Sequence, residues 1–135
     1  MLWLAMLALA LDLSAVKSEP NPEKRSDRAL EYANAALDSA KSAYQEGRWE
    51  QTQAALQEID TAVTLSYDSL VSTGKNPRKS SGAFKKAEKA TRELLRRLSG
   101  FRDFMSAVDH PAVDPVVARV TEVHDQLISG IMTGK

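Results

Sequence analysis

The feature that most constrains the fold is a row of apolar residues in the second half of the chain, spaced three and four positions apart. The members of this row, here called the seam, are Phe84, Ala87, Leu94, Leu98, Phe101, Met105 and Val108, with Thr91 filling the one gap. Such spacing puts every member on one narrow face of an α-helix, and a long helix with one apolar face packs lengthwise against other helices. The spacing keeps its phase across Gly100, so we expect one continuous helix from Ala83 to Asp109.

Three further segments show the same amphipathic spacing. We expect helices over residues 26–46, 49–73 and 114–131. Only Gly47 and Arg48 separate the first two helices, which must therefore fold back on each other as an antiparallel hairpin. Asp114 as N-cap with Pro115 at the first helical position predicts the start of the last helix. Four such helices joined by short loops predict an all-α fold, an antiparallel four-helix up-down bundle.

The turn of the first hairpin has the sequence YQEGRWEQ over residues 44–51. It resembles the turn of a tetratricopeptide unit, in which an aromatic residue ends one helix, glycine follows, and a second aromatic residue opens the next helix. The resemblance covers residues 29–70 and implies a close-packed helical hairpin, which in that family contributes to a concave peptide-binding surface. No second copy follows at the family's period of about 34 residues. The order of the last two helices is also similar to that of small exported bacterial helical proteins.

Residues 1–13 form an apolar run that is interrupted only by Asp12. The run is shorter than the roughly 20 apolar residues needed to span a bilayer, and its length suits the apolar region of a secretory signal. We therefore expect residues 1–15 to be a signal segment that touches the membrane transiently, with cleavage after Ala15 or Ser18, and the mature protein to be periplasmic or secreted. An uncleaved interfacial anchor and an ordinary helix of the fold are the alternatives.

The segment that follows this run, residues 16–25, contains two prolines and mostly polar neighbours. Such composition is typical of a disordered linker. The remaining residues, 26–135, then form the four-helix domain.

Charge is unevenly distributed along a chain whose formal net charge is zero. Ten acidic and five basic residues lie between Glu19 and Leu70, whereas two acidic and ten basic residues lie between Val71 and Arg102. Four of the basic residues recur at helical spacing away from the seam, and they are Lys85, Lys89, Arg92 and Arg96. One interpretation is a solvated face that pairs with the acidic helices. The other is a candidate face for an acidic protein or an anionic envelope component, and no nucleic acid is expected because no aromatic residues interleave these cations.

His124 is the main candidate for a ligand-binding side chain. Its spacing from Val120 and Leu127 puts it on or beside the apolar face of the last helix. A histidine in a bundle can bind haem or zinc, and Met105 could supply a second haem ligand. The alternative is a boundary histidine that hydrogen bonds to a hydroxyl or a carboxylate. The chain has no cysteine, which excludes disulfides and thiolate metal sites.

No group of residues suggests a catalytic mechanism. Acidic neighbours such as Glu58 with Asp60, or Asp103 with Asp109, fall on polar helix faces instead of in a shared pocket. Serines are frequent, but no nucleophile-elbow motif accompanies them. The sequence therefore predicts a non-catalytic, cofactor-free interaction or scaffold protein of the exported class, with a ligand- or cofactor-binding bundle centred on His124 as the alternative.

Overall fold

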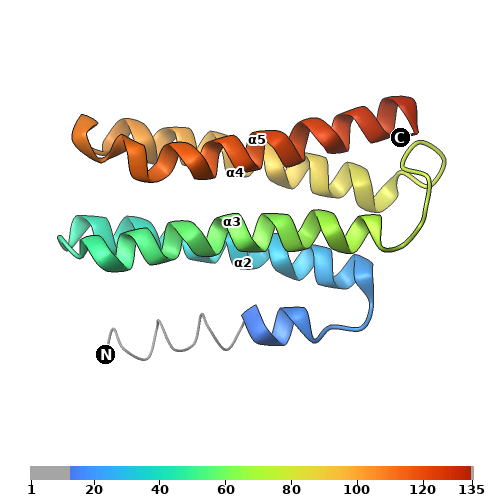
Figure 1. Ribbon diagram of the computed structural model, residues 1–135, viewed down its shortest axis with the longest axis horizontal. Coiled ribbons are helices and arrows are strands. Elements are labelled where there is room, and N and C mark those ends of the chain that lie inside the picture. The colour runs from blue at the N-terminus through green and yellow to red at the C-terminus, as the bar shows by residue number, and fades with distance from the viewer. Residues whose placement is uncertain (1–12, 135) are drawn as a thin grey trace.

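The computed structural model describes residues 13–134, and within that range all regular structure is helical. The elements are α2 (Pro22–Gln45), α3 (Trp49–Val71), α4 (Gly82–Phe104), the short 3-10 turn η1 (Ala107–Asp109) and α5 (His110–Thr133). Figure 1 shows that α2 with α3 and α4 with α5 form two elongated hairpins stacked on each other. None of the described helices is both long and apolar enough to cross a membrane. Residues 1–12, where we expect most of the signal segment, lie outside the described residues.

The order in which the four long helices pack differs from that of a simple up-down bundle. Within each hairpin the helices are antiparallel, as expected, but α2 has α4 as its neighbour across the interface and α3 has α5. Both of these neighbouring pairs run parallel (Figure 1). The connection over residues 72–81 makes this arrangement possible, because it crosses the end of the bundle diagonally from α3 to α4.

Ion pairs between the hairpins follow one constant register. They are Lys86 with Asp27 at 2.7 Å, Arg97 with Asp38, and Arg119 with Asp60 at 3.4 Å. In each pair the two residues are 59 positions apart, which is the relation expected for helices that run in the same direction. The hydrogen bond to Asp27 raises the pKa of Lys86. Exposed pairs of this kind contribute little net stability, so their main effect is on which register the hairpins adopt.

The core confirms the seam over most of its length. The side chains of Phe84, Ala87, Thr91, Leu94, Leu98, Phe101 and Met105 are all buried. They pack into one cluster with residues such as Leu37 of α2, Ile59 of α3 and Val120 of α5. The helix also continues through Gly100 as expected.

The prediction that this helix reaches Asp109 was wrong. Helix α4 ends at Phe104, and Met105 has an extended backbone with φ of −72° and ψ of 152°. The chain then enters η1, so Val108 leaves the face shared by the other seam residues and is 82% exposed. Periodic spacing alone did not reveal this break, because Met105 remains buried after the helix has ended.

The last helix also starts earlier than expected, at His110 instead of next to Pro115. Pro111 fits there because the first turn of a helix leaves its N–H groups without intrahelical partners. Asp114 therefore does not cap the helix. Its carboxylate accepts a hydrogen bond from Arg102 Nε at 2.7 Å, which lowers the pKa of Asp114 and links the end of α4 to the start of α5.

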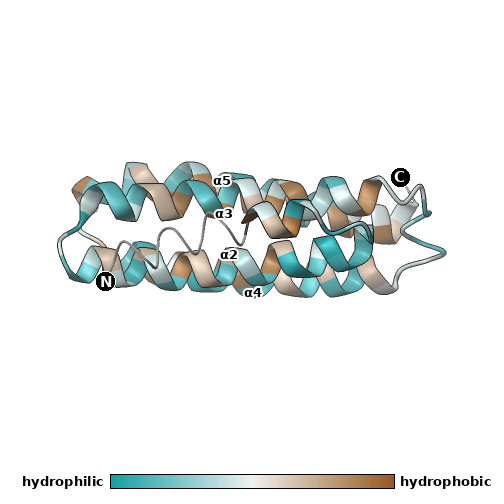
Figure 2. Ribbon diagram, turned by 90° about the horizontal axis from the view of Figure 1, so that it is seen from below, coloured by the Kyte–Doolittle hydropathy of each residue, from teal (hydrophilic) through white to brown (hydrophobic). Residues whose placement is uncertain are grey.

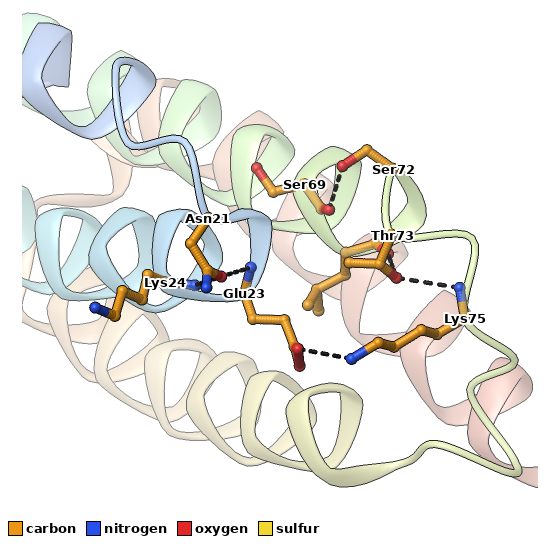
Figure 3. A network of polar contacts seen from close by, with 8 residues as sticks. Asn21, Glu23, Lys24, Ser69, Ser72, Thr73 and Lys75 are labelled. Atoms are coloured by element: carbon orange, nitrogen blue, oxygen red, sulfur yellow. Dashed lines mark hydrogen bonds and ion pairs between the residues drawn. The ribbon is translucent and has the colours of Figure 1, made fainter.

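The first helix begins at Pro22, with its N-cap at Asn21 instead of at the expected Ser26 or Asp27. The Asn21 side chain accepts hydrogen bonds from the backbone N–H groups of Glu23 and Lys24 at 3.0 and 3.1 Å (Figure 3). Asn21 is thus a side-chain N-cap, with proline at the first helical position. The same view shows Lys75 reaching Glu23 Oε1 at 2.9 Å, which ties the diagonal connection to the start of α2.

The chain before α2 is also ordered, in contrast to the disordered linker expected over residues 16–25. Residues 13–17 are helical, and the side chains of Leu13 and Val16 are buried. Arg25 donates hydrogen bonds to the Glu19 carbonyl at 2.9 Å and to Ser69 Oγ at 2.8 Å. Figures 1 and 2 show these helical residues lying over the α2–α3 hairpin, on the side away from α4 and α5.

Tyr44 joins the two hairpins at the opposite end of the bundle from the diagonal connection. Its hydroxyl donates to Asp109 Oδ2 at 2.8 Å and accepts the backbone N–H of Ser106 at 2.9 Å. The ring makes edge contacts with Trp49, Phe101 and Phe104 at centroid distances of 6.3, 5.8 and 6.1 Å. One side chain at the end of α2 therefore holds both the α2–α3 turn and the α4–α5 connection.

We predict that Leu98→Ala destabilises the protein by about 2–5 kcal/mol, because it removes a fully buried side chain from a tightly packed core. Urea unfolding followed by circular dichroism measures this difference. The half-buried neighbour Leu95 provides the control, and Leu95→Ala should have a smaller effect. Equal losses for the two variants would contradict the assigned core.

We also predict that Tyr44→Phe lowers the free energy of unfolding by about 1–2 kcal/mol, since it removes two hydrogen bonds and keeps the ring. Tyr67→Phe is the matched control, because the Tyr67 hydroxyl makes no hydrogen bond to any residue between 13 and 134. Thermal melts of both variants provide the comparison. A Tyr44→Phe protein as stable as the control would show that the hydroxyl does not join the hairpins.

Candidate functional site

An open groove runs between α4 and α5 on the outer side of the second hairpin. Its volume is about 440 Å³, and it is lined by Lys85, Glu88, Lys89 and Arg92 from α4 and by Ile128, Ile131 and Met132 from α5. Ile128 and Met132 expose 36% and 70% of their surface there. Cationic side chains therefore form one wall of the groove, and apolar side chains form the other.

The basic residues of α4 divide between two edges of the helix. On the edge facing α2, Lys86 and Arg97 pair with acidic side chains of that helix. On the edge facing α5, Lys85 and Lys89 are exposed and pair with no acidic side chain in the described part of the chain. The edge of α4 that faces α2 is thus paired with an acidic helix, as one interpretation of the sequence expected. The edge that faces α5 keeps an excess of positive charge.

Three of the four residues predicted to form a basic face meet at the groove. Lys85, Lys89 and Arg92 line it, whereas Arg96 lies one turn farther along α4. Arg96 pairs with Glu93 on its own helix and is not part of the groove lining.

Glu88 is the one acidic side chain in the groove lining, and it has two partners. His124 Nε2 lies 2.8 Å from Glu88 Oε2, and Arg92 Nε lies 3.3 Å from the same oxygen. The His124 side chain is only 14% exposed. His124 is therefore a boundary histidine bonded to a carboxylate, which was one of the two interpretations from the sequence.

The second interpretation, a haem held by His124 and Met105, does not fit the geometry. His124 contacts Glu88 of α4 and therefore lies at the same level of the bundle as Glu88. Met105 comes 17 positions after Glu88 in the chain. At 1.5 Å per residue the separation is about 25 Å, too far for two ligands of one iron. Within residues 13–134 no group of three histidine, aspartate or glutamate side chains is placed to hold a metal ion.

The other acidic residues singled out from the sequence mostly join helices. Glu58 accepts a hydrogen bond from the Tyr32 hydroxyl at 3.2 Å. Asp60 pairs with Arg119, and Asp109 accepts from Tyr44. Asp103 is exposed. These carboxylates lie on three different elements of the bundle, α3, α4 and η1.

Sequence reasoning missed the apolar wall of the groove. Ile128 and Met132 are four positions apart on α5, and this spacing puts them on the same side of the helix, beside the face that faces the core. Their role depends on which edge of α4 lies beside them. That information comes from the packing of the hairpin and not from the spacing within either helix.

Comparison with known protein families, curated proteins and solved structures yields no match for this chain. The inferences about function below therefore come from its own residues.

Proposed function

We propose that this protein is a non-catalytic, exported helical interaction module that binds an anionic partner in the groove between α4 and α5. One observation carries the proposal. Lys85 and Lys89 lack acidic partners within the described residues, and they lie directly opposite exposed apolar side chains of α5.

The two walls would contribute to binding in different ways. Long-range attraction to the cations would bring an acidic surface to the groove and orient it. Contact with Ile128 and Met132 would then remove apolar surface from water, which is the larger source of affinity. Because the charges on Lys85 and Lys89 are exposed, dissolved salt should screen the attraction strongly.

The non-catalytic part of the proposal is supported by the partners of the ionisable side chains. His124 is bonded to Glu88, and the carboxylates of Asp60 and Asp109 hold helices together. Asp60 and Asp109 are thereby occupied in contacts between helices, away from the groove. Export is supported by the apolar run at residues 1–13, and mass spectrometry of the mature N-terminus tests it directly.

We predict that the double charge reversal Lys85→Glu with Lys89→Glu abolishes binding to anionic probes. The probes are poly-glutamate and vesicles containing phosphatidylglycerol, each tested at low and at physiological salt. Wild-type protein should bind at least one probe in a salt-dependent way, and the variant should bind about tenfold more weakly or not at all, a loss of about 1.4 kcal/mol or more.

The control is Lys24→Glu with Lys79→Glu, which makes the same change in net charge at two exposed lysines outside the groove. Circular dichroism spectra should show that both double variants fold. Equal loss of binding in the two variants would mean that only overall charge matters and would contradict a site at the groove. Absence of binding by wild-type protein at low salt would contradict the proposal as a whole.

A further inference from the structure

The two hairpins differ in how their outer sides are covered. Over α2 and α3, the helical residues 13–17 lie across the outer side of the hairpin, with Leu13 and Val16 buried at 8% and 7% exposure (Figures 1 and 2). No described residue covers the corresponding groove over α4 and α5, where Ile128 and Met132 remain exposed. On one hairpin, therefore, a helical segment with two buried apolar residues three positions apart covers the outer side of a helix pair.

The walls of the uncovered groove repeat with the period of a helix. On α4 the cations Lys85, Lys89 and Arg92 follow steps of four and three, and on α5 the apolar residues Ile128, Ile131 and Met132 follow steps of three and one. The row of cations extends for about 10 Å along α4, at 1.5 Å per residue. An occupant that lies along the helix axes and has the same period can meet both rows at once.

We propose that the α4–α5 groove binds an α-helical segment of a partner protein, with carboxylates along one edge and apolar side chains three and four positions apart beside them. This inference rests on the proposed function of the same groove and specifies the class of partner.

The charges around the groove also set the orientation of this helix. Its acidic edge lies over α4, where Lys85 and Lys89 are available. Glu88 does not oppose it strongly, because that carboxylate is already paired with Arg92 and hydrogen bonded to His124. On the α5 side, the exposed Asp125 would repel acidic groups. The apolar face of the partner therefore turns toward α5.

A helix fits these features better than a lipid surface does. A flat bilayer would contact the crests of α4 and α5, whereas Ile131 is half-buried between them. A single helix can lie along a pair of helices, as residues 13–17 lie along α2 and α3 with Leu13 and Val16 buried. A lipid surface is nevertheless a separate outcome of the test below.

The test uses a labelled synthetic helical peptide with glutamates at positions i, i+4 and i+7 and leucines on the adjoining face. Two control peptides have the same length: one carries lysine for every glutamate, and one has the same composition in scrambled order. Fluorescence anisotropy should show that the acidic amphipathic peptide binds the full-length protein at least about tenfold more tightly than either control, since each tenfold step in affinity corresponds to about 1.4 kcal/mol.

Variants of both walls locate the site. Lys85→Glu with Lys89→Glu should weaken binding of the acidic peptide about tenfold or more, and Lys24→Glu with Lys79→Glu should not. Met132→Ser, at a 70% exposed position that tolerates change, should weaken binding without loss of fold, and Ile128→Ser added to it should weaken it further.

The possible contrary results separate this inference from the proposed function. Equal binding of the acidic and scrambled peptides would overturn a helical partner and leave an anion-binding groove. Groove-dependent binding to phosphatidylglycerol vesicles without binding to the peptide would also overturn it, in favour of a lipid surface. If wild-type protein binds neither peptide, vesicles nor poly-glutamate, both proposals fail.

Discussion

Burial of the apolar seam of α4 is the constraint on which the other features depend. Once Leu94, Leu98 and Phe101 face the core, the basic residues of α4 cannot all face the same neighbour. One edge turns toward α2 and the other toward α5. The acidic residues of α2 neutralise the first edge, and the second edge has only Glu88 within the groove lining. The same packing step that completes the core therefore leaves an excess of positive charge beside α5.

The parallel stacking of the hairpins follows from the distribution of charge and from the length of the diagonal connection. A short loop would have placed α4 beside α3, as in a simple up-down bundle. The ten-residue connection over residues 72–81 instead allows α4 to lie beside α2, where the Asp27–Lys86 and Asp38–Arg97 pairs share one register. Each exposed pair is weak. A shift of one helix turn would separate all of them together, and that collective cost favours a single alignment.

Much of the fold could be predicted from the sequence because local spacing determines it. The helical class and the buried seam up to Met105 followed from spacing along single helices. Spacing also placed His124 at the edge of an apolar face, but its partner Glu88 lies on another helix and was not predicted. Helix ends were less predictable. Pro111 and Pro115 both fit a helix start, and Asn21 with Pro22 forms as good a start as Ser26.

The candidate site was predictable only in part, because it depends on contacts between helices. Lys85, Lys89 and Arg92 were identified from their spacing, but the spacing of α4 does not show that the acidic residues of α2 pair with Lys86 and Arg97 instead of with them. The apolar wall formed by α5 becomes part of a site only when the second hairpin has folded. Tertiary packing thus decides which cations remain available for a partner.

Cross-linking of paired cysteines tests the stacking of the hairpins most directly, because the natural chain has no cysteine and gives no background. The pair Asp60→Cys with Arg119→Cys joins α3 to α5 at the position of an observed ion pair. The pair Asp60→Cys with Glu93→Cys would be adjacent only if α3 packed antiparallel beside α4. With a short bis-maleimide reagent, the parallel arrangement predicts efficient cross-linking of the first pair and little of the second. The reverse result would contradict the parallel stacking of the two hairpins.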